Sequence, residues 1–120
     1  MAEHNELGKL GEEIALDHLI DKGYTILETN WRFGKEEIDI IAINKEFLII
    51  VEVKTRSSLL FGDPADFVSK QKQRLLIKAT QVYAERYKIQ QEVRFDVISI
   101  LSNKQKTEVK HIENAFYPVL

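Results

Sequence analysis

The sequence has no cysteine, two prolines and one tryptophan, and it has no long uninterrupted hydrophobic run. The absence of cysteine excludes disulfides, thiolate zinc sites and a cysteine nucleophile, and it suits a reducing compartment. No segment approaches the roughly 18 apolar residues that cross a bilayer. The acidic start "MAEHNELGKLGEE" lacks the basic residues and the apolar stretch of a signal peptide. We therefore expect a cytoplasmic protein without membrane association.

The composition is that of a folded protein. The chain has 120 residues, of which 44% are hydrophobic and 30% are charged, well away from the range of disordered chains. This length can enclose one core, and no internal repeat or linker is visible, so we predict a single domain over residues 1–120. The net charge of −2 argues against a nucleic-acid binder that relies on bulk positive charge. Basic residues are nevertheless concentrated between residues 67 and 88.

Hydrophobic periodicity predicts the order of the secondary-structure elements. Helical spacing covers residues 5–22 and 68–87, and Gly23 is expected to end the first helix. β-rich segments cover residues 24–30, 37–43, 47–54, 93–101 and 108–112, with a polar loop over residues 55–66. The order predicts an α/β fold, α-β-β-β-α-β-β, whose central mixed sheet is flanked by helices. The apolar run at residues 48–51 is typical of a strand covered on both faces, which favours the third strand as the middle one.

The third strand, "FLIIVEVK", ends in charged residues. If the turn at residues 44–47 closes a tight hairpin, residues whose numbers sum to 91 face each other. Asp39 then lies opposite Glu52, with Cβ atoms about 5 Å apart. Two adjacent carboxylates raise each other's pKa unless a cation lies between them. Lys54 shares the face of Glu52 by strand alternation, which predicts one patch of three charged side chains. A slip of one residue in the register would move Asp39 to the other face.

Such a patch is suited to phosphodiester hydrolysis. Two carboxylates can bind Mg²⁺ and leave the other positions to water and phosphate oxygens. The metal would polarise the phosphate and acidify a bound water, while Lys54 would orient that water or offset the charge of the transition state. The alternative from spacing alone is a strand that emerges into solvent, with Lys54 as an ordinary ion-pair partner of Asp39 or Glu52.

Short motifs along the whole chain resemble those of one family. "EIDII" followed by "VEVKTR" resembles the Asp…Glu-x-Lys signature of the PD-(D/E)XK nuclease superfamily. With "GKLGEEIALDHL", "NWRFGKEEIDIIA", "FVSKQKQRLL", "RFDVISI" and "HIENAF", it resembles the YraN-like family of small bacterial proteins, which is similar to archaeal Holliday-junction resolvases. The resemblance implies a restriction-endonuclease-like fold and a deoxyribonuclease activity that depends on Mg²⁺ or Mn²⁺.

The resemblance also implies roles for individual residues. Asp39 and Glu52 would be the metal-binding carboxylates, Lys54 the water-orienting lysine, and the backbone carbonyl of Val53 a further metal ligand. Glu12, in the "GKLGEE" motif, matches an acidic residue that reaches the metal or its water shell. An acid in an early helix turn is also stabilised by the helix dipole alone, which is the alternative for Glu12.

Three small features near these residues leave questions open. Gly8 and Gly11 lie inside the first helix, where each glycine costs about 1 kcal/mol relative to alanine. Close approach of the helix to the sheet or to DNA beside Glu12 would explain them, and so would close packing alone. Glu36 stands where the family usually has glycine, so the resemblance defines the start of the Asp39 strand less well.

Four basic residues are candidate DNA contacts. Lys72 and Arg74 open the second helix, where the helix dipole and free amides also favour phosphate, and the resemblance places a lysine near Lys72. Arg32 and Arg56 flank the strands that carry Asp39 and Glu52. Each arginine would either bind a phosphate or balance local acids.

Three functions compete. The leading interpretation is a metal-dependent endonuclease acting on branched or otherwise structured DNA, with the junction preference resting on fold analogy. Junction resolution takes two cuts and would therefore need a homodimer. The second interpretation is a non-catalytic DNA-binding accessory protein in DNA uptake, repair or recombination. A purely structural interaction module is the third, and it leaves Asp39, Glu52 and Lys54 unexplained.

Overall fold

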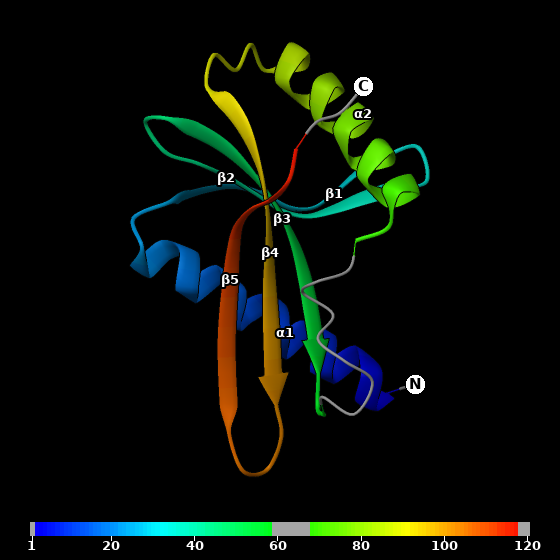
Figure 1. Ribbon diagram of the computed structural model, residues 1–120, viewed down its shortest axis with the longest axis vertical. Coiled ribbons are helices and arrows are strands. Elements are labelled where there is room, and N and C mark those ends of the chain that lie inside the picture. The colour runs from blue at the N-terminus through cyan, green and yellow to red at the C-terminus, as the bar shows by residue number, and fades with distance from the viewer. Residues whose placement is uncertain (1, 59–67, 118–120) are drawn as a thin grey trace.

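The fold is a five-stranded sheet with one helix on each face (Figure 1). The computed structural model describes residues 2–58 and 68–117, with side chains from residue 6 onward. The elements in chain order are α1 (Ala2–Asp21), β1 (Thr25–Phe33), β2 (Glu36–Ile43), β3 (Phe47–Arg56), α2 (Lys70–Arg86), β4 (Glu92–Ser102) and β5 (Thr107–Phe116). This order confirms the predicted α/β fold with its mixed sheet. No helix in the described residues is long and apolar enough to span a membrane.

The strands lie side by side in sequence order, β1 to β5. β1, β2 and β3 form an antiparallel meander, β3 and β4 are parallel, and β4 pairs antiparallel with β5. Parallel neighbours need a long crossover connection, and α2 lies within the connection from β3 to β4. β3 is the middle strand, as the apolar run at residues 48–51 predicts.

Two hydrophobic layers lie on opposite faces of the sheet. Alternation along β3 separates them, because Leu48 and Ile50 pack in one layer while Ile49 and Val51 pack in the other. The first layer includes Leu76 and other apolar residues of α2, and the second includes Leu19 and Ala15 of α1. The helical spacing of Leu7, Leu10, Ile14, His18 and Leu19 predicts the apolar face of this helix. Leu19 is fully buried as expected, but Leu10 is 42% exposed and the other fully buried side chain described in this helix is Ala15.

The element boundaries follow from local chemistry. α1 ends before Gly23, which has φ +91°, and this confirms the predicted stop. α2 begins after Ser69, whose hydroxyl accepts a hydrogen bond from the backbone N–H of Lys72 at 3.1 Å. β3 continues to Arg56, so the predicted loop over residues 55–66 begins too early. Residues 59–67 of that loop lie outside the described residues.

The strand β2 changes its orientation at Asp39. Ile38 packs in the layer under α2 and Ile40 in the layer under α1, although a regular strand would place both on one face. The β1–β2 ladder pairs Thr29 with Ile40 and Trp31 with Ile38, and it skips the residues between them. The skipped residue of β1 is Asn30, which has φ +52°, a left-handed conformation that asparagine tolerates better than most residues. The Asp39 carboxylate therefore emerges where the strand switches faces.

The "RFDVISI" and "HIENAF" motifs meet at Asp96 in β4. Its carboxylate is fully buried and accepts hydrogen bonds from the Arg94 guanidinium at 3.0 and 2.9 Å and from the backbone N–H of Asn114 at 3.0 Å. His111 Nε2 lies 2.7 Å from the same carboxylate, and His18 of α1 contacts the other ring nitrogen of His111 at 3.0 Å. The motifs thus tie β4, β5 and α1 together. We call this group the Asp96 cluster.

Candidate functional site

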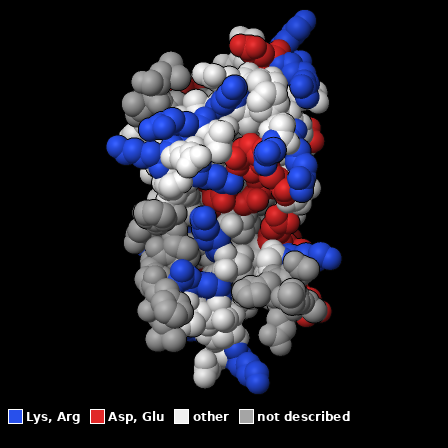
Figure 2. Space-filling model, turned by 90° about the vertical axis from the view of Figure 1, so that its right-hand side faces the viewer, with Lys and Arg blue, Asp and Glu red and all other residues white. Residues whose placement is uncertain are grey.

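An acidic patch with basic side chains around it lies on one face of the molecule (Figure 2). On this side of Figure 1 lie the turn between β1 and β2 and the N-terminal ends of both helices. Three ion pairs join acids of β2 and β3 to lysine and arginine side chains here: Arg32–Glu37, Lys54–Glu52 and Lys72–Glu36. We call the group formed by Asp39, Glu52, Lys54, Glu36 and Lys72 the acidic cluster.

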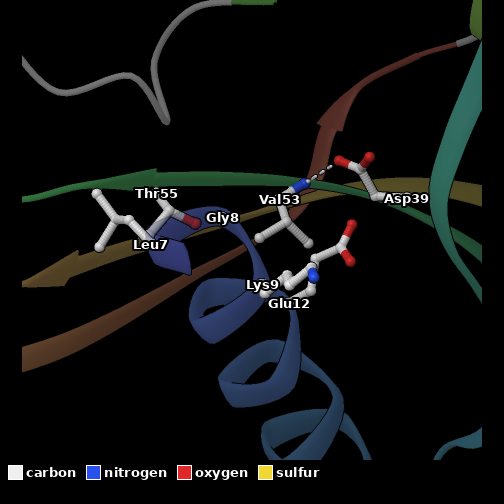
Figure 3. Close-up of a pocket in the computed structure, with 7 residues that line it drawn as sticks. All are labelled: Leu7, Gly8, Lys9, Glu12, Asp39, Val53 and Thr55. Carbon is white, nitrogen blue, oxygen red and sulfur yellow. Dashed lines mark hydrogen bonds between the residues drawn. The ribbon is translucent and has the colours of Figure 1, made fainter. Parts of the chain in front are cut away.

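Asp39 and Glu52 lie where β2 and β3 stop pairing. The ladder runs from Ile43↔Leu48 to Ile40↔Val51, which confirms the predicted register with residue numbers that sum to 91. It ends before Asp39, so the predicted direct pairing with Glu52 is replaced by a different contact. Asp39 Oδ2 accepts a hydrogen bond from the backbone N–H of Val53 at 2.8 Å (Figure 3).

The side of the sheet that faces α1 carries a pocket of about 410 Å³. Asp39, Val53 and Thr55 line it from the sheet, and Glu12 lines it from α1, as Figure 3 shows. Its remaining lining comes from Leu7, Gly8 and Lys9. Glu12 and Asp39 both line this pocket, so an acid of α1 and an acid of β2 lie at the same opening.

The side of the sheet that faces α2 carries Glu52 and Lys54, because both alternate with the core residues of β3 that pack there. Lys54 Nζ lies 3.7 Å from Glu52 Oε1. The Glu52 side chain is only 11% exposed, and its second oxygen, Oε2, is buried without a hydrogen-bond partner among the described residues. Asp39, at the face switch, therefore lies between the pocket on one side and Glu52 on the other.

Burial and mutual repulsion change the pKa values of the acids. Burial raises the pKa of Asp39 to about 7, and the charge of Glu52 adds to this rise, while the hydrogen bond from Val53 opposes it. Burial also raises the pKa of Glu52 above its usual range, although Lys72 and Lys54 pull it down. The pKa values of both carboxylates are therefore raised, as predicted; Glu52 contributes to the rise at Asp39, whereas burial and the charge of Glu36 raise the pKa of Glu52.

The donor set suits a hard divalent cation. Mg²⁺ is commonly bound through one or two carboxylates, with water and phosphate oxygens in the other positions. Asp39 and Glu52 supply two carboxylates, and one oxygen of Glu52 has no hydrogen-bond partner among the described residues. The N–H and C=O of a strand residue point to the same side, so the carbonyl of Val53 faces the same opening as its N–H. Within the described residues no three Asp, Glu or His side chains converge enough to hold a metal by themselves, so outer ligands would complete the shell.

The two glycines of α1 have different surroundings. A Cβ on Gly11 would lie far inside contact distance of the Thr55 side chain, so close packing on β3 requires glycine there. A Cβ on Gly8 would meet no described atom within 4 Å, and Gly8 lines the pocket. Gly11 is therefore explained by packing and Gly8 is not.

The predicted basic residues fall into different environments. Lys72 Nζ contacts Glu36 Oε1 at 2.6 Å, inside the acidic cluster. Arg32 is 72% exposed and pairs with Glu37 at 3.0 Å, which fits a role in balancing local acids. Arg56 is half-buried at the end of β3, and Arg74 is exposed on α2.

Two residues of the site were not selected from the sequence. The amide of Asn30 lies against Glu12, with Nδ2 3.3 Å from Oε2, and with the amide turned over it would donate to Glu12 at 2.9 Å and to Glu37 at 2.7 Å. Glu36 was singled out only as a departure from glycine, and it proves to be the ion-pair partner of Lys72. Both contacts depend on tertiary placement, and the only local signal was the unusual glutamate itself.

The fold and the site define a small mixed α/β protein. Its acidic cluster lies where β2 and β3 stop pairing. The chain belongs to the uncharacterised protein family UPF0102, whose model matches residues 11–100. It is 51% identical over 117 residues to a UPF0102 protein of Flavobacterium psychrophilum and 48% identical over 118 residues to one of Phocaeicola vulgatus, with 98% of both chains covered in each case. A UPF0102 protein of Christiangramia forsetii is 51% identical over 117 residues, again with 98% of each chain covered. These matches confirm the YraN-like family that the motifs indicate.

Proposed function

We propose that the protein is a metal-dependent endonuclease that hydrolyses phosphodiester bonds of DNA. The observation that carries the proposal is the pair of neighbouring carboxylates, Asp39 and Glu52, with raised pKa values, an unpaired buried oxygen and a lysine alongside. Buried acids that lack counter-charge are costly for a fold, and perturbed groups of this kind are concentrated at functional sites.

Each residue of the cluster has a distinct task in this proposal. Asp39 and Glu52 would bind Mg²⁺ or Mn²⁺, with the carbonyl of Val53 as a further ligand, and Glu12 would contact the water shell from α1. A bound cation would polarise the phosphate and lower the pKa of a bound water. Lys54, half-exposed beside Glu52, donates hydrogen bonds that orient the attacking water and offset the negative charge that develops on the phosphate.

Basic side chains around the acidic patch support DNA as the substrate (Figure 2). Three cations, Lys70, Lys72 and Arg74, lie in the first turns of α2, where the helix amides also favour phosphate. Arg56 extends from the end of β3, beyond Lys54. Arg32 would contact phosphate only by leaving Glu37. The similarity of the YraN-like family to archaeal Holliday-junction resolvases adds the expectation of branched or structured DNA, and cutting two strands of a junction would require a homodimer.

The proposal is tested by incubating the full-length protein with duplex, single-stranded, flap and four-way-junction DNA in Mg²⁺ or Mn²⁺. Asp39→Asn, Glu52→Gln and Lys54→Met should each lower cleavage by at least about a hundredfold, because each removes a group that acts on the reacting phosphate. Lys106→Met, whose lysine pairs with Glu108 on the β4–β5 hairpin, serves as the charge-matched control and should cleave normally.

The outcomes separate the competing functions. Cleavage that survives in all three site variants would show a contaminating nuclease and overturn the proposal. Salt-dependent DNA binding without cleavage in either metal would favour the accessory protein instead. Absence of both binding and cleavage would leave the structural module as the better interpretation.

A further inference from the structure

The ammonium group of Lys72 lies among the acids of the proposed metal site. Its Nζ is 2.6 Å from Glu36 Oε1, and the two side chains are only 34% and 12% exposed. Burial alone would lower the pKa of Lys72, yet the contact with Glu36 and the charges of Glu52 and Asp39 raise it. A lysine from one helix thus interacts electrostatically with acids on both β2 and β3.

The position of Lys72 in α2 makes this arrangement unusual. Lys72 is in the first helical turn, where its backbone N–H binds the capping hydroxyl of Ser69, and no acid is present in that turn. The dipole of a helix disfavours cations at the N-terminus. The negative charge that compensates Lys72 therefore comes from the sheet, chiefly from Glu36. The contact with Glu36 is what holds the ammonium group against the sheet.

We propose that Lys72 is a positioning residue that serves as a resident counter-cation: its ammonium group occupies the acidic cluster until a divalent metal binds, and the metal displaces it. This inference rests on the proposed function, because it assumes that Asp39 and Glu52 bind the metal. A cluster of buried acids without any cation would repel itself, and Lys72 lowers that repulsion in the metal-free protein.

Two consequences follow for the site. Lys72 competes with the metal for the same negative charge, so it weakens metal binding in the free protein. Once displaced, the ammonium group is free at the N-terminus of α2, where it can contact a DNA phosphate. Metal binding and phosphate binding are then coupled through one side chain.

The test measures metal affinity directly, by calorimetric titration of the full-length protein with Mn²⁺ and with Mg²⁺. Lys72→Met should tighten Mn²⁺ binding by about three- to tenfold, because it removes a competing charge of intermediate exposure. Lys72→Arg keeps the charge and should bind nearly as the unmodified protein does. Lys70→Met removes an exposed lysine two residues away and is the matched control, with unchanged affinity expected.

The melting temperature is a second measurement that tests the role of Lys72 without relying on metal affinity. Without metal, Lys72→Met should melt at a lower temperature than the unmodified protein, because Glu36 loses its partner. Saturating Mg²⁺ should then raise the melting temperature more in Lys72→Met than in the unmodified protein. Lys72→Gln gives the same comparison if the methionine variant fails to fold.

The failure of this inference is distinguishable from the failure of the proposed function. If the unmodified protein binds Mn²⁺, Asp39→Asn abolishes binding and Lys72→Met does not tighten it, the metal site stands and the role of Lys72 is wrong. If neither the unmodified protein nor any Lys72 variant binds either metal, the proposed metal site is overturned and this inference with it.

Discussion

The sheet buries acidic side chains in two places, and their surroundings are opposite. Asp96 receives hydrogen bonds from Arg94 and from the backbone of Asn114, and His111 contacts it as well. Burial alone would raise the pKa of Asp96, yet His111, Arg94 and Asn114 lower it below the usual range. Asp39 accepts one hydrogen bond, from Val53, among the described contacts, and its pKa is raised to about 7.

This difference separates an acid whose charge is balanced by the protein from one whose charge is balanced only in part. Both oxygens of the Asp96 carboxylate are in contact with polar groups of the protein itself, so this carboxylate needs no external cation or hydrogen-bond donor. In the acidic cluster a buried oxygen of Glu52 has no partner in the described residues, and the repulsion between neighbouring acids is only partly offset by lysines. Burial of a carboxylate is common to both places, and only the supply of donors distinguishes them.

Disrupting the Asp96 cluster is expected to have the largest effect on stability. Asp96→Asn leaves the buried Arg94 with only the more distant and more exposed Glu113 as an acidic partner, and we expect the free energy of unfolding to fall by about 3 kcal/mol. The matched change Asp39→Asn removes a repelled charge and should leave stability in metal-free buffer at neutral pH unchanged or higher. Urea denaturation at pH 7.5 with a chelator measures both. Equal losses in the two variants would contradict the contrast drawn between the clusters.

The pH dependence of stability should show the same contrast. In the folded protein the pKa of Asp39 is about 7, whereas an unperturbed aspartate has a pKa of 3.8. Between these values the folded state binds more protons than the unfolded state, so this group makes stability fall as the pH rises from about 4 through 7.

Asp39→Asn should remove that fall, which amounts to at most about 1.4 kcal/mol per pH unit. Asp96 acts in the opposite sense, because its lowered pKa supports stability above about pH 4 that is lost in more acidic solution. Unfolding free energies of the unmodified protein and of Asp39→Asn, measured in chelator from pH 4.5 to 7.5, provide the check. A constant difference between them across this range would contradict the raised pKa.

The glycines of α1 give an intermediate effect. Gly11→Ala would force a Cβ against Thr55 and should lower the free energy of unfolding by about 1–3 kcal/mol. Gly8→Ala meets open space at the pocket and should raise it by up to about 1 kcal/mol, because alanine favours the helix. Thermal unfolding of the two variants measures the difference. If Gly8→Ala destabilised as much as Gly11→Ala, the pocket beside Glu12 would not be open as described.

The smallest effect is expected at the rim of the acidic cluster. The Arg32–Glu37 pair is largely exposed on the arginine side, so Arg32→Ala should change stability by less than about 0.5 kcal/mol. A larger loss would mean that the Arg32–Glu37 pair supports the fold, and it would contradict the contrast between the Asp96 cluster and the acidic cluster.

The sequence predicts much of the frame that positions the acids. The turn at residues 44–47 specifies the β2–β3 register, the apolar run at residues 48–51 places β3 in the middle, and Gly23 ends α1. These signals work because they are local: turn geometry, strand coverage and helix termination are each encoded within a few residues.

The remaining features depend on contacts between distant segments. The face switch at Asp39 lies opposite the left-handed Asn30 on a neighbouring strand. The Asp96 cluster requires the irregular β4–β5 register around Asn114, and the partner of Glu36 comes from α2. Sequence spacing therefore predicted that Asp39 and Glu52 lie near each other, but it missed how Asp39 reaches this position and that Lys72 pairs with Glu36 beside it.

Side-chain carboxyl NMR of the metal-free protein, followed from pH 2.5 to 9 and repeated with saturating Mg²⁺, is the most direct test. We predict that Asp39 titrates near pH 7 and Asp96 below pH 3.8. Mg²⁺ should shift the Asp39 and Glu52 signals and leave the Asp96 signal unchanged. Ordinary titration of both aspartates, or Mg²⁺ shifts at neither Asp39 nor Glu52, would contradict it.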